Sequence, residues 1–278
     1  MLEYLWLGGG QNGDTVSAKS FKLLVTENGN PTIGSTWEPS EELPFPMAGH
    51  CLSSYENSNF LYLISGGVIL DGSVSGRSFM YSSNRQKQES PWSEVGLMRV
   101  PRKLHSCLPY KLNNFEVILA IGGQDVNNMV LQSSEIFYIR SNNWALLNHQ
   151  LPWQIANAHV LKMNDRLLFL GGQRGISPQQ LVWSYHPSVG WRRSSIILDV
   201  PLSSHVSLSL KSADITHKNH PNILIFGGQL TNGKMATTEA LCIARDRSNA
   251  LDPYCDSAVT NIMDLSKDIS IQGIKACR

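Results

Sequence analysis

The sequence predicts an all-β chain in which about five similar units are arranged as a β-propeller. The first observation is an apolar run that ends in two glycines, best seen at residues 115–123, and that recurs along the 278-residue chain. The double glycines begin at Gly8, Gly66, Gly122, Gly171 and Gly227, 49 to 58 residues apart. The second observation is the composition, with 22 glycines, 13 prolines and only 16% charged residues, which is typical of short strands joined by tight turns. A period of about fifty residues indicates an array of similar supersecondary units.

Each repeat contains further landmarks in a constant order. A polar loop and an apolar strand follow each double glycine; we expect these strands at 21–25, around residues 79 and 81, and at 136–139, 181–185 and 240–244. A tryptophan comes next, at Trp37, Trp92, Trp144 and Trp191, and then a histidine that opens another strand, at His50, His105, His159 and His205. Four short strands joined by turns form a meander sheet, and such sheets become stable when they pack face to face around an axis. The glycines would allow close backbone approach, and each tryptophan would fill space between neighbouring sheets.

The order of these landmarks resembles the kelch repeat. The quoted features are a double glycine, a tyrosine and a tryptophan six residues later, as in Tyr138 to Trp144 and Tyr185 to Trp191, and the resemblance covers about residues 5–245. Two repeats depart from it, because no aromatic residue stands six places before Trp37 or Trp92, and Tyr254 stands where the fifth repeat should have a tryptophan. The resemblance implies a kelch-type β-propeller that recognises another protein. In some members of the family, arginines on one face of the propeller bind acidic peptide motifs.

The two ends of the chain leave closure of the ring open. We assign residues 1–258 to the propeller repeats and 259–278 to a C-terminal tail. The first recognisable strand already ends in the double glycine, so the first repeat lacks its inner strand. Either the tail supplies that strand, with 268–276 as the candidate, or the ring is incomplete.

Strand direction predicts the binding face. The loops after the double glycines (11–15, 70–75, 125–130, 174–178 and 231–234) should emerge on the same side as the loops before the histidines (45–47, 100–103, 153–155 and 201–203). Binding residues of repeat proteins commonly lie on such loops. The candidates that we select are Arg102, Lys103, Arg174, Met47 and Ile155. Lys234 adds a cation, yet the remaining loops do not complete a ring of positive charge, and solvated loop charges are the alternative interpretation.

Histidine and cysteine residues give no clear metal or redox motif. We expect the repeated histidines to bond neighbouring backbone groups, with a metal site in the central channel as the alternative. Asp214, His217 and His220 have ligand-like spacing, but they lie in a long polar insertion. Cys51 and Cys107 follow their histidines by one and two residues, which puts them on opposite faces of a strand, so we expect buried free thiols. Cys255 and Cys277 would pair in a secreted protein or stay reduced elsewhere; Cys242 lies nearby and the total of five is odd.

Composition and missing motifs restrict the functional classes. A net charge of +1 does not favour nucleic acid or an anionic membrane, and no apolar run reaches the roughly 20 residues of a membrane helix. The absence of a signal-peptide pattern favours a cytoplasmic location. Sialidase boxes, nucleophile elbows, phosphate loops and zinc-protease motifs are missing. We therefore predict a non-catalytic module without a cofactor that binds a protein or peptide on the loop face. The alternative is a copper- or other metal-dependent propeller enzyme similar to galactose oxidase.

Overall fold

The computed structural model describes residues 3–25, 34–55, 61–82, 90–112, 115–163, 166–209, 223–231, 233–234, 238–243 and 258–263. The regular structure in these ranges consists of strands, without a helix. Neighbouring strands pair in the antiparallel sense, as β1 does with β4 and β23 with β24. The prediction of an all-β fold is therefore confirmed.

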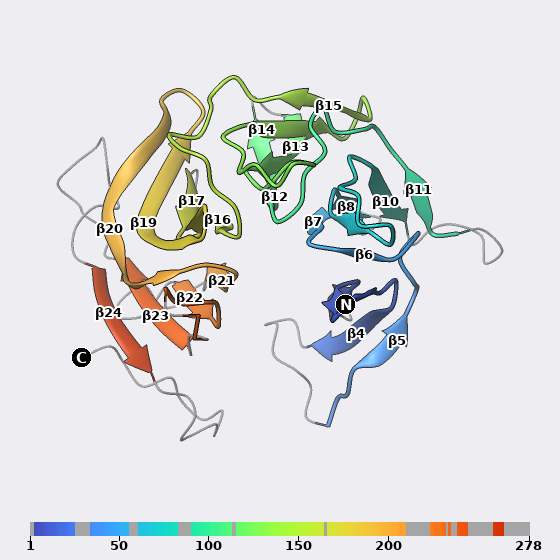
Figure 1. Ribbon diagram of the computed structural model, residues 1–278, viewed down its shortest axis with the longest axis horizontal. Coiled ribbons are helices and arrows are strands. Elements are labelled where there is room, and N and C mark those ends of the chain that lie inside the picture. The colour runs from blue at the N-terminus through green and yellow to red at the C-terminus, as the bar shows by residue number, and fades with distance from the viewer. Residues whose placement is uncertain are drawn as a thin grey trace. The chain divides into compact units, whose positions relative to one another are not determined.

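Five large sheets follow one another along the chain and can be traced by colour in Figure 1. The first sheet contains β1 (Glu3–Gly8), β4 (Ser20–Val25) and β5 (Glu38–Ser40). The second contains β7 (Cys51–Tyr55), β8 (Leu61–Ser65), β10 (Ser78–Ser82) and β11 (Trp92–Glu94). The third contains β12 (Ser106–Leu112), β13 (Phe115–Ile121), β14 (Ser134–Tyr138) and β15 (Asn143–Leu146). The fourth contains β16 (His159–Met163), β17 (Arg166–Leu170), β18 (Gln173–Arg174), β19 (Ser177–His186) and β20 (Gly190–Leu202). The fifth contains β21 (Val206–Ser209), β22 (Ile223–Phe226), β23 (Thr238–Ile243) and β24 (Ala258–Met263).

Two short strand pairs lie in the loops. β2 (Gln11–Asn12) pairs with β3 (Thr15–Val16), and β6 (Met47–Ala48) pairs with β9 (Val68–Ile69). The first sheet has three strands with β1 at its edge, and in the described ranges no strand pairs on the other side of β1. At the other end, the predicted tail begins inside β24, the last strand of the fifth sheet. The candidate ring-closing strand at 268–276 lies outside the described residues, so closure stays a prediction.

The chain forms two compact units. Unit 1 contains Met1–Leu119, Gln124–Met129 and Glu135–Leu146, and thus the first two sheets and most of the third. Unit 2 contains Ala120–Gly123, Val130–Ser134 and Leu147–Arg278, and thus the fourth and fifth sheets.

Each unit has its own hydrophobic core. In unit 1, the buried side chains of Leu43, Met47, Ile64, Phe79 and Trp92 form one cluster, with Trp6 and Tyr62 packed against it. In unit 2, the corresponding cluster joins the fourth sheet to the fifth and consists of Leu161, Leu168, Leu170, Val182, Leu198, Leu202, Ile223 and Ile225. The apolar runs that end in double glycines supply the central strands of these clusters, which is why they are hydrophobic throughout.

A double glycine forms a contact site, here called a glycine socket, for the backbone of the entry loop, which is the loop before the first strand of the next sheet. The second glycine donates its N–H to a carbonyl of the next sheet's entry loop, as Gly67 does to Arg102 at 2.8 Å and Gly172 does to Leu202 at 2.8 Å. A Cβ on Gly66 would lie 2.2 Å from the Arg102 carbonyl oxygen, and Gly66 has φ +66°, so both space and backbone conformation require glycine. The first pair is Gly9–Gly10, because Gly10 donates to the Met47 carbonyl. The sequence-based start at Gly8 was therefore one residue early.

The tryptophans pair with aromatic residues across adjacent strands. The partners in register are Tyr81 with Trp92, Phe137 with Trp144 and Tyr185 with Trp191, with ring centroids 5.0 to 5.2 Å apart. In the third repeat, the residue that faces the indole of Trp144 is Phe137, which directly precedes Tyr138. Trp92 does have an aromatic partner, separated from it by a longer connection.

A residue with positive φ marks the entry to each inner strand. These residues are Gly49, Leu104, Asn157 and Ser204, with φ between 53° and 61°. The next residue is a histidine in three repeats, but it is Ala158 in the fourth. His159 is therefore one position later than the equivalent histidines, and its ring has different contacts, which the conserved-looking spacing in sequence concealed.

Candidate interaction surface

The two predicted sets of loops lie together in each repeat. Met47 pairs with Ile69 and Ala48 with Val68, which joins the loop before β7 to the loop after the double glycine of the same sheet. Single bridges make the same connection in later repeats, between Lys103 and Gln124, Ala156 and Gln173, and Ser203 and Gln229. The direction of the strands therefore predicted correctly which loops are neighbours.

Three of the five proposed binding residues have side chains that are buried in the core instead of displayed on the loop face. Met47, Arg102 and Ile155 occupy one equivalent position, where the carbonyl accepts the hydrogen bond from the second glycine. Their side chains have exposed fractions of 2%, 0% and 2%. At this position the backbone carbonyl bonds to the glycine socket and the side chain points into the core. These residues therefore pack under the loops and do not belong to the exposed surface.

Arg102 forms a buried ion pair with Glu135 of β14. The guanidinium Nη2 lies 2.8 Å from Oε1 of Glu135, and both side chains have no exposed surface. The same carboxylate accepts hydrogen bonds from the backbone N–H groups of Arg99 at 2.8 Å and Val100 at 3.0 Å. Burial lowers the pKa of Arg102, and the Glu135 charge opposes this shift. The arginine therefore holds the entry loop of the third sheet against β14, and it is not accessible to a surface ligand.

Lys103 and Arg174 are the two candidates that reach the surface. The Lys103 Nζ donates to the side-chain oxygen of Asn128 at 2.7 Å. Arg174 is exposed in β18, and Ile176 beside it is 96% exposed. Because Lys103 belongs to unit 1 and Arg174 to unit 2, each must be considered with its own loops.

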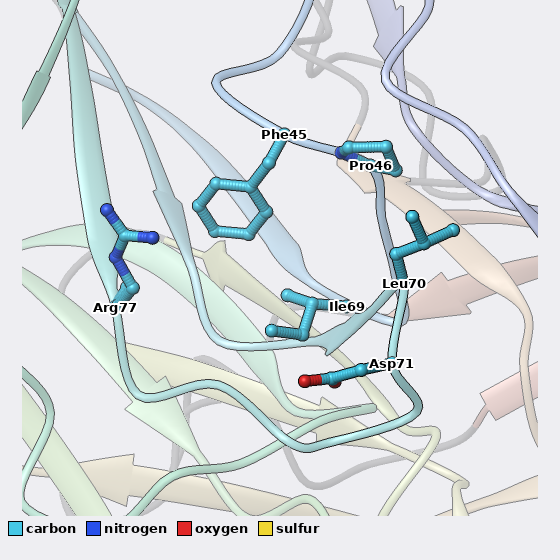
Figure 2. A pocket seen from close by; sticks show the side chains of 6 residues that line it. All are labelled: Phe45, Pro46, Ile69, Leu70, Asp71 and Arg77. Atoms are coloured by element: carbon cyan, nitrogen blue, oxygen red, sulfur yellow. The ribbon is translucent and has the colours of Figure 1, made fainter.

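An open pocket lies on the loop face of unit 1 (Figure 2). Its volume is about 590 Å³, and its lining residues are Phe45, Pro46, Ile69, Leu70, Asp71 and Arg77. The first two come from the loop before β7 and the next three from the loop after the double glycine, so the paired loops create this hollow. Figure 2 shows the Arg77 guanidinium beside the Phe45 ring and the Asp71 carboxylate near Ile69.

The two charged groups at the pocket differ in their partners. Arg77 makes two 2.7 Å hydrogen bonds to the Glu94 carboxylate, and its guanidinium lies 4.9 Å from the ring centroids of both Phe45 and Phe79. Asp71 accepts a 2.8 Å hydrogen bond from the Ser73 backbone N–H, and bonds with Ser73 lower the pKa of the carboxyl group. Asp71 has no ion pair among the described residues.

The loops after the double glycines carry exposed apolar side chains in several repeats. In unit 1 these are Leu70, Val126 and Met129, with exposed fractions of 70%, 56% and 60%. Ile176 occupies the corresponding loop in the fourth repeat. An isolated exposed apolar residue is common, but its recurrence at equivalent loops is typical of an interaction surface. These exposed apolar residues were not among the predicted binding residues, although they recur in the loops after the double glycines.

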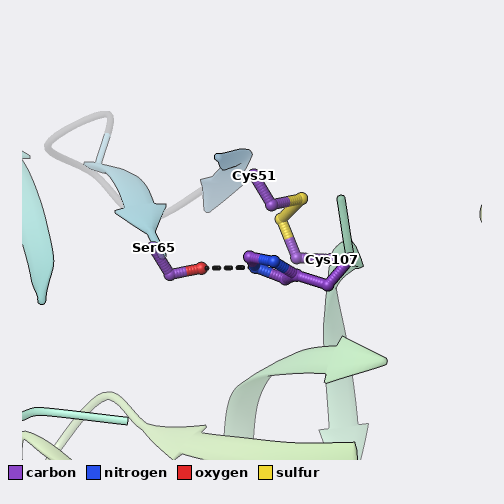
Figure 3. Close-up of a disulfide and its surroundings, with 4 residues drawn as sticks. Cys51, Ser65 and Cys107 are labelled. Carbon is purple, nitrogen blue, oxygen red and sulfur yellow. Dashed lines mark hydrogen bonds between the residues drawn. A yellow bond between two sulfur atoms is a disulfide. The ribbon is translucent and has the colours of Figure 1, made fainter. Parts of the chain in front are cut away.

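Cys51 and Cys107 form a disulfide between β7 and β12, with their Cα atoms 5.9 Å apart (Figure 3). The expectation of free thiols was therefore wrong. The inner strands β7 and β12 of the second and third sheets lie against each other, so a residue directed forward from one meets a residue directed backward from the other. The positions of Cys51 and Cys107 on opposite faces of their strands seemed to exclude a disulfide. Between two adjacent sheets, these are the positions that bring the two sulfur atoms together.

Burial keeps the inner-strand histidines neutral. It lowers the pKa of His50 to about 4 and that of His205 to about 3. His105 Nε2 lies 3.1 Å from Ser65 Oγ, the contact drawn in Figure 3. This contact joins neighbouring sheets, but its partner is a side-chain hydroxyl instead of the predicted backbone group, and neither ring nitrogen of His205 has a hydrogen-bond partner among the described residues. The described residues contain no group of three or more histidine, cysteine, aspartate or glutamate side chains able to hold a metal ion. Asp214, His217, His220, Cys255 and Cys277 lie outside the described residues.

The repeated antiparallel sheets, glycine sockets and aromatic pairs are consistent with the repeats of a kelch-type β-propeller. Comparison with curated proteins agrees: the chain is similar to Kelch-like protein 34 of Homo sapiens, with 26% identity over 180 residues. The match covers 56% of this chain and 27% of the length of that relative. It supports the resemblance to the kelch-repeat family.

No protein-family model matches the chain. Among the described residues there is no helix with the length and hydrophobicity needed to span a bilayer.

Proposed function

We propose that this chain is a non-catalytic interaction module that binds a protein, or a peptide segment of one, on its loop face. The observation that carries the proposal is the pocket between the two paired loops of unit 1, where apolar side chains line an open hollow. Pre-formed concave sites with mostly apolar linings and a few polar groups are the usual form of binding sites. The similarity to a kelch-like protein supports the same class of function.

A selection experiment tests this proposal. Random dodecapeptides displayed on phage are selected on the immobilised full chain, and the affinity of enriched peptides is measured by fluorescence anisotropy. We expect at least one enriched peptide whose affinity falls about tenfold with Leu70→Asp, because the few residues at the centre of an interface that dominate binding cost about 1–2 kcal/mol or more when they are altered.

The matched control is Leu146→Asp. Leu146 is 53% exposed and also belongs to unit 1, but it lies in β15 at the end of the third sheet. The proposal fails if no peptide is enriched, or if Leu146→Asp weakens the selected peptides as much as Leu70→Asp does.

A further inference from the structure

We propose that the pocket at Phe45, Pro46, Ile69 and Leu70 takes an apolar side chain of an extended peptide, and that Asp71 binds a lysine or arginine next to it. This inference rests on the proposed function and specifies the chemistry of its ligand. It differs from the acidic ligand that the family resemblance implied.

The walls of the pocket favour an apolar side chain. Four of its six lining residues are apolar, and Leu70 exposes 70% of its side chain there. The backbone on both sides is fixed, because Ile69 pairs with Met47 and its N–H donates to the Ser73 carbonyl at 3.0 Å. A pre-formed apolar hollow needs little reorganisation when it accepts a ligand, which favours binding.

The charges around the pocket favour a cation in the ligand. The Arg77 guanidinium is already engaged with both oxygens of Glu94 and stacked on two phenylalanine rings. A ligand carboxylate would have to compete with Glu94 for it. Asp71 has only backbone and hydroxyl partners in its own turn, so its negative charge is not compensated by a cation among the described residues. An ammonium or guanidinium group is the complement of such a carboxylate.

The turn makes Asp71 a fixed acceptor. Gly72 N–H donates to the Ile69 carbonyl at 2.9 Å, and Ser73 N–H donates to Asp71 Oδ1 at 2.8 Å. These bonds fix the carboxyl group at the pocket, and none of its partners within this turn, which lies in the described part of the chain, is a cation. The equivalent loop of the next repeat has the same kind of turn, since Asp125 Oδ1 accepts from Asn127 at 2.8 Å and Met129 at 2.9 Å. Asp125 does not line the pocket, which makes it a matched control.

The test uses three labelled nonapeptides with a central leucine flanked by lysines, glutamines or glutamates, titrated with the full chain in an anisotropy assay. We expect the lysine peptide to bind about 2- to 5-fold more tightly than the glutamine peptide, and the glutamate peptide to bind most weakly, as for exposed ion pairs. Asp71→Asn keeps the acceptor for the Ser73 N–H and should abolish the preference for lysine. Asp71→Lys should reverse it, and Asp125→Asn should leave it unchanged.

Several results overturn the inference. These are equal or tighter binding of the glutamate peptide, no binding of the lysine peptide at millimolar concentration, or the same loss with Asp125→Asn as with Asp71→Asn. In each case, phage-selected peptides that still bind and still respond to Leu70→Asp would leave the proposed function standing. Failure of the selection as well would remove both.

Discussion

The same joint between consecutive inner strands has different chemistry in the two units. In unit 1, Cys51 of β7 is bonded covalently to Cys107 of β12. In unit 2, His159 of β16 lies at the position of Cys51, and its Nδ1 is 2.7 Å from the Oγ of Ser207 in β21, at the position of Cys107. The equivalence follows from the positive-φ residues, because Cys51 and His159 are each two residues beyond one and Cys107 and Ser207 are each three residues beyond one.

The difference teaches that the fold specifies a contact at this joint but leaves its chemistry open. A disulfide responds to the redox state of the solution, whereas a buried histidine responds to pH. Burial lowers the pKa of His159 to about 4. The neighbouring ring of His205, with its centroid 6.4 Å away, would oppose a second positive charge there.

The contact between each entry loop and its own sheet varies in the same way. Phe45 packs edge-to-face on Phe79 in the second sheet, and Trp153 packs on Trp183 in the fourth, with ring centroids 5.2 and 4.1 Å apart. In the third sheet, the entry loop contacts its sheet through the Arg102–Glu135 ion pair, which Arg102 makes from the position equivalent to Met47 and Ile155. Of these three contacts, one is ionic and two are aromatic. Removal of one partner should lower the free energy of unfolding most at the ionic contact.

The largest effect is expected for Glu135→Gln. It leaves the Arg102 charge buried without a counter-ion, and breaking a buried pair in this way costs about 3–5 kcal/mol. Urea unfolding followed by tryptophan fluorescence measures the change. Glu94→Gln is the control, since the Glu94–Arg77 pair is exposed and should contribute less than about 1 kcal/mol.

A paired variant sharpens this prediction. Arg102→Met combined with Glu135→Gln removes both charges and keeps a side-chain oxygen that can accept one of the Arg99 and Val100 N–H groups, so it should recover part of the lost stability. Equal effects of Glu135→Gln and Glu94→Gln, or a double variant no more stable than Glu135→Gln, would contradict the view that the ionic contact is an interchangeable form of the aromatic one.

Loss of the disulfide should have the next largest effect. The bond closes a segment of 56 residues, and removal of a native crosslink typically lowers the free energy of unfolding by about 2–4 kcal/mol. Cys51→Ser with Cys107→Ser should show this change in urea unfolding. Dithiothreitol should cause the same loss in the wild type and none in the double variant; an unchanged wild type in dithiothreitol would count against a stabilising bridge.

Acid should weaken the joint of unit 2 by a similar amount. The unfolded chain protonates His159 near pH 6.5 and the folded chain only near 4, so stability is complete above pH 6.5 and declines as the pH falls to 4. The loss approaches about 3 kcal/mol, at about 1.4 kcal/mol for each pKa unit. His50, His105 and His205 add to the acid sensitivity, so the test compares His159→Gln with the wild type at pH 7.5 and 4.5. A smaller decrease in Tm for the variant is expected; equal decreases would contradict the assignment.

Ser207→Ala should have the smallest effect. It removes one hydrogen bond to a neutral ring, which typically contributes about 1 kcal/mol, less than the disulfide at the equivalent place. Ser207 is 2% exposed, so alanine leaves only a small cavity. Thermal unfolding at pH 7.5 measures the shift, and a loss equal to that of the double cysteine variant would show that the two joints are equally strong.

The sequence was sufficient to predict whatever depends on local pattern. The period of the double glycines, the apolar central strands and the neighbouring loops all follow from it and agree with the structure. The burial of Arg102 was not predictable, since its partner Glu135 is 33 residues away. The disulfide was not predictable from the faces of a single strand, because its two cysteines come from β7 and β12, which belong to two adjacent sheets.

The chemistry of the pocket was also not predictable from the sequence. Both loops that form it were identified, but its character depends on which side chains remain available. Nothing in the sequence shows that Arg77 has partners. In the structure its guanidinium bonds to Glu94 and stacks on two phenylalanine rings. Asp71 attracted no attention, because a single aspartate in a turn has no distinctive pattern.

The glycine sockets have a consequence for how such a chain can evolve. The contact that joins one repeat to the next is made by a backbone carbonyl, so it does not discriminate among the side chains of Met47, Arg102, Ile155 and Leu202. A duplicated repeat can therefore join its neighbours before any of its side chains have adapted to them. Afterwards, these positions can diverge while the glycines stay, and homology between such arrays then fades from the sequence long before the architecture changes.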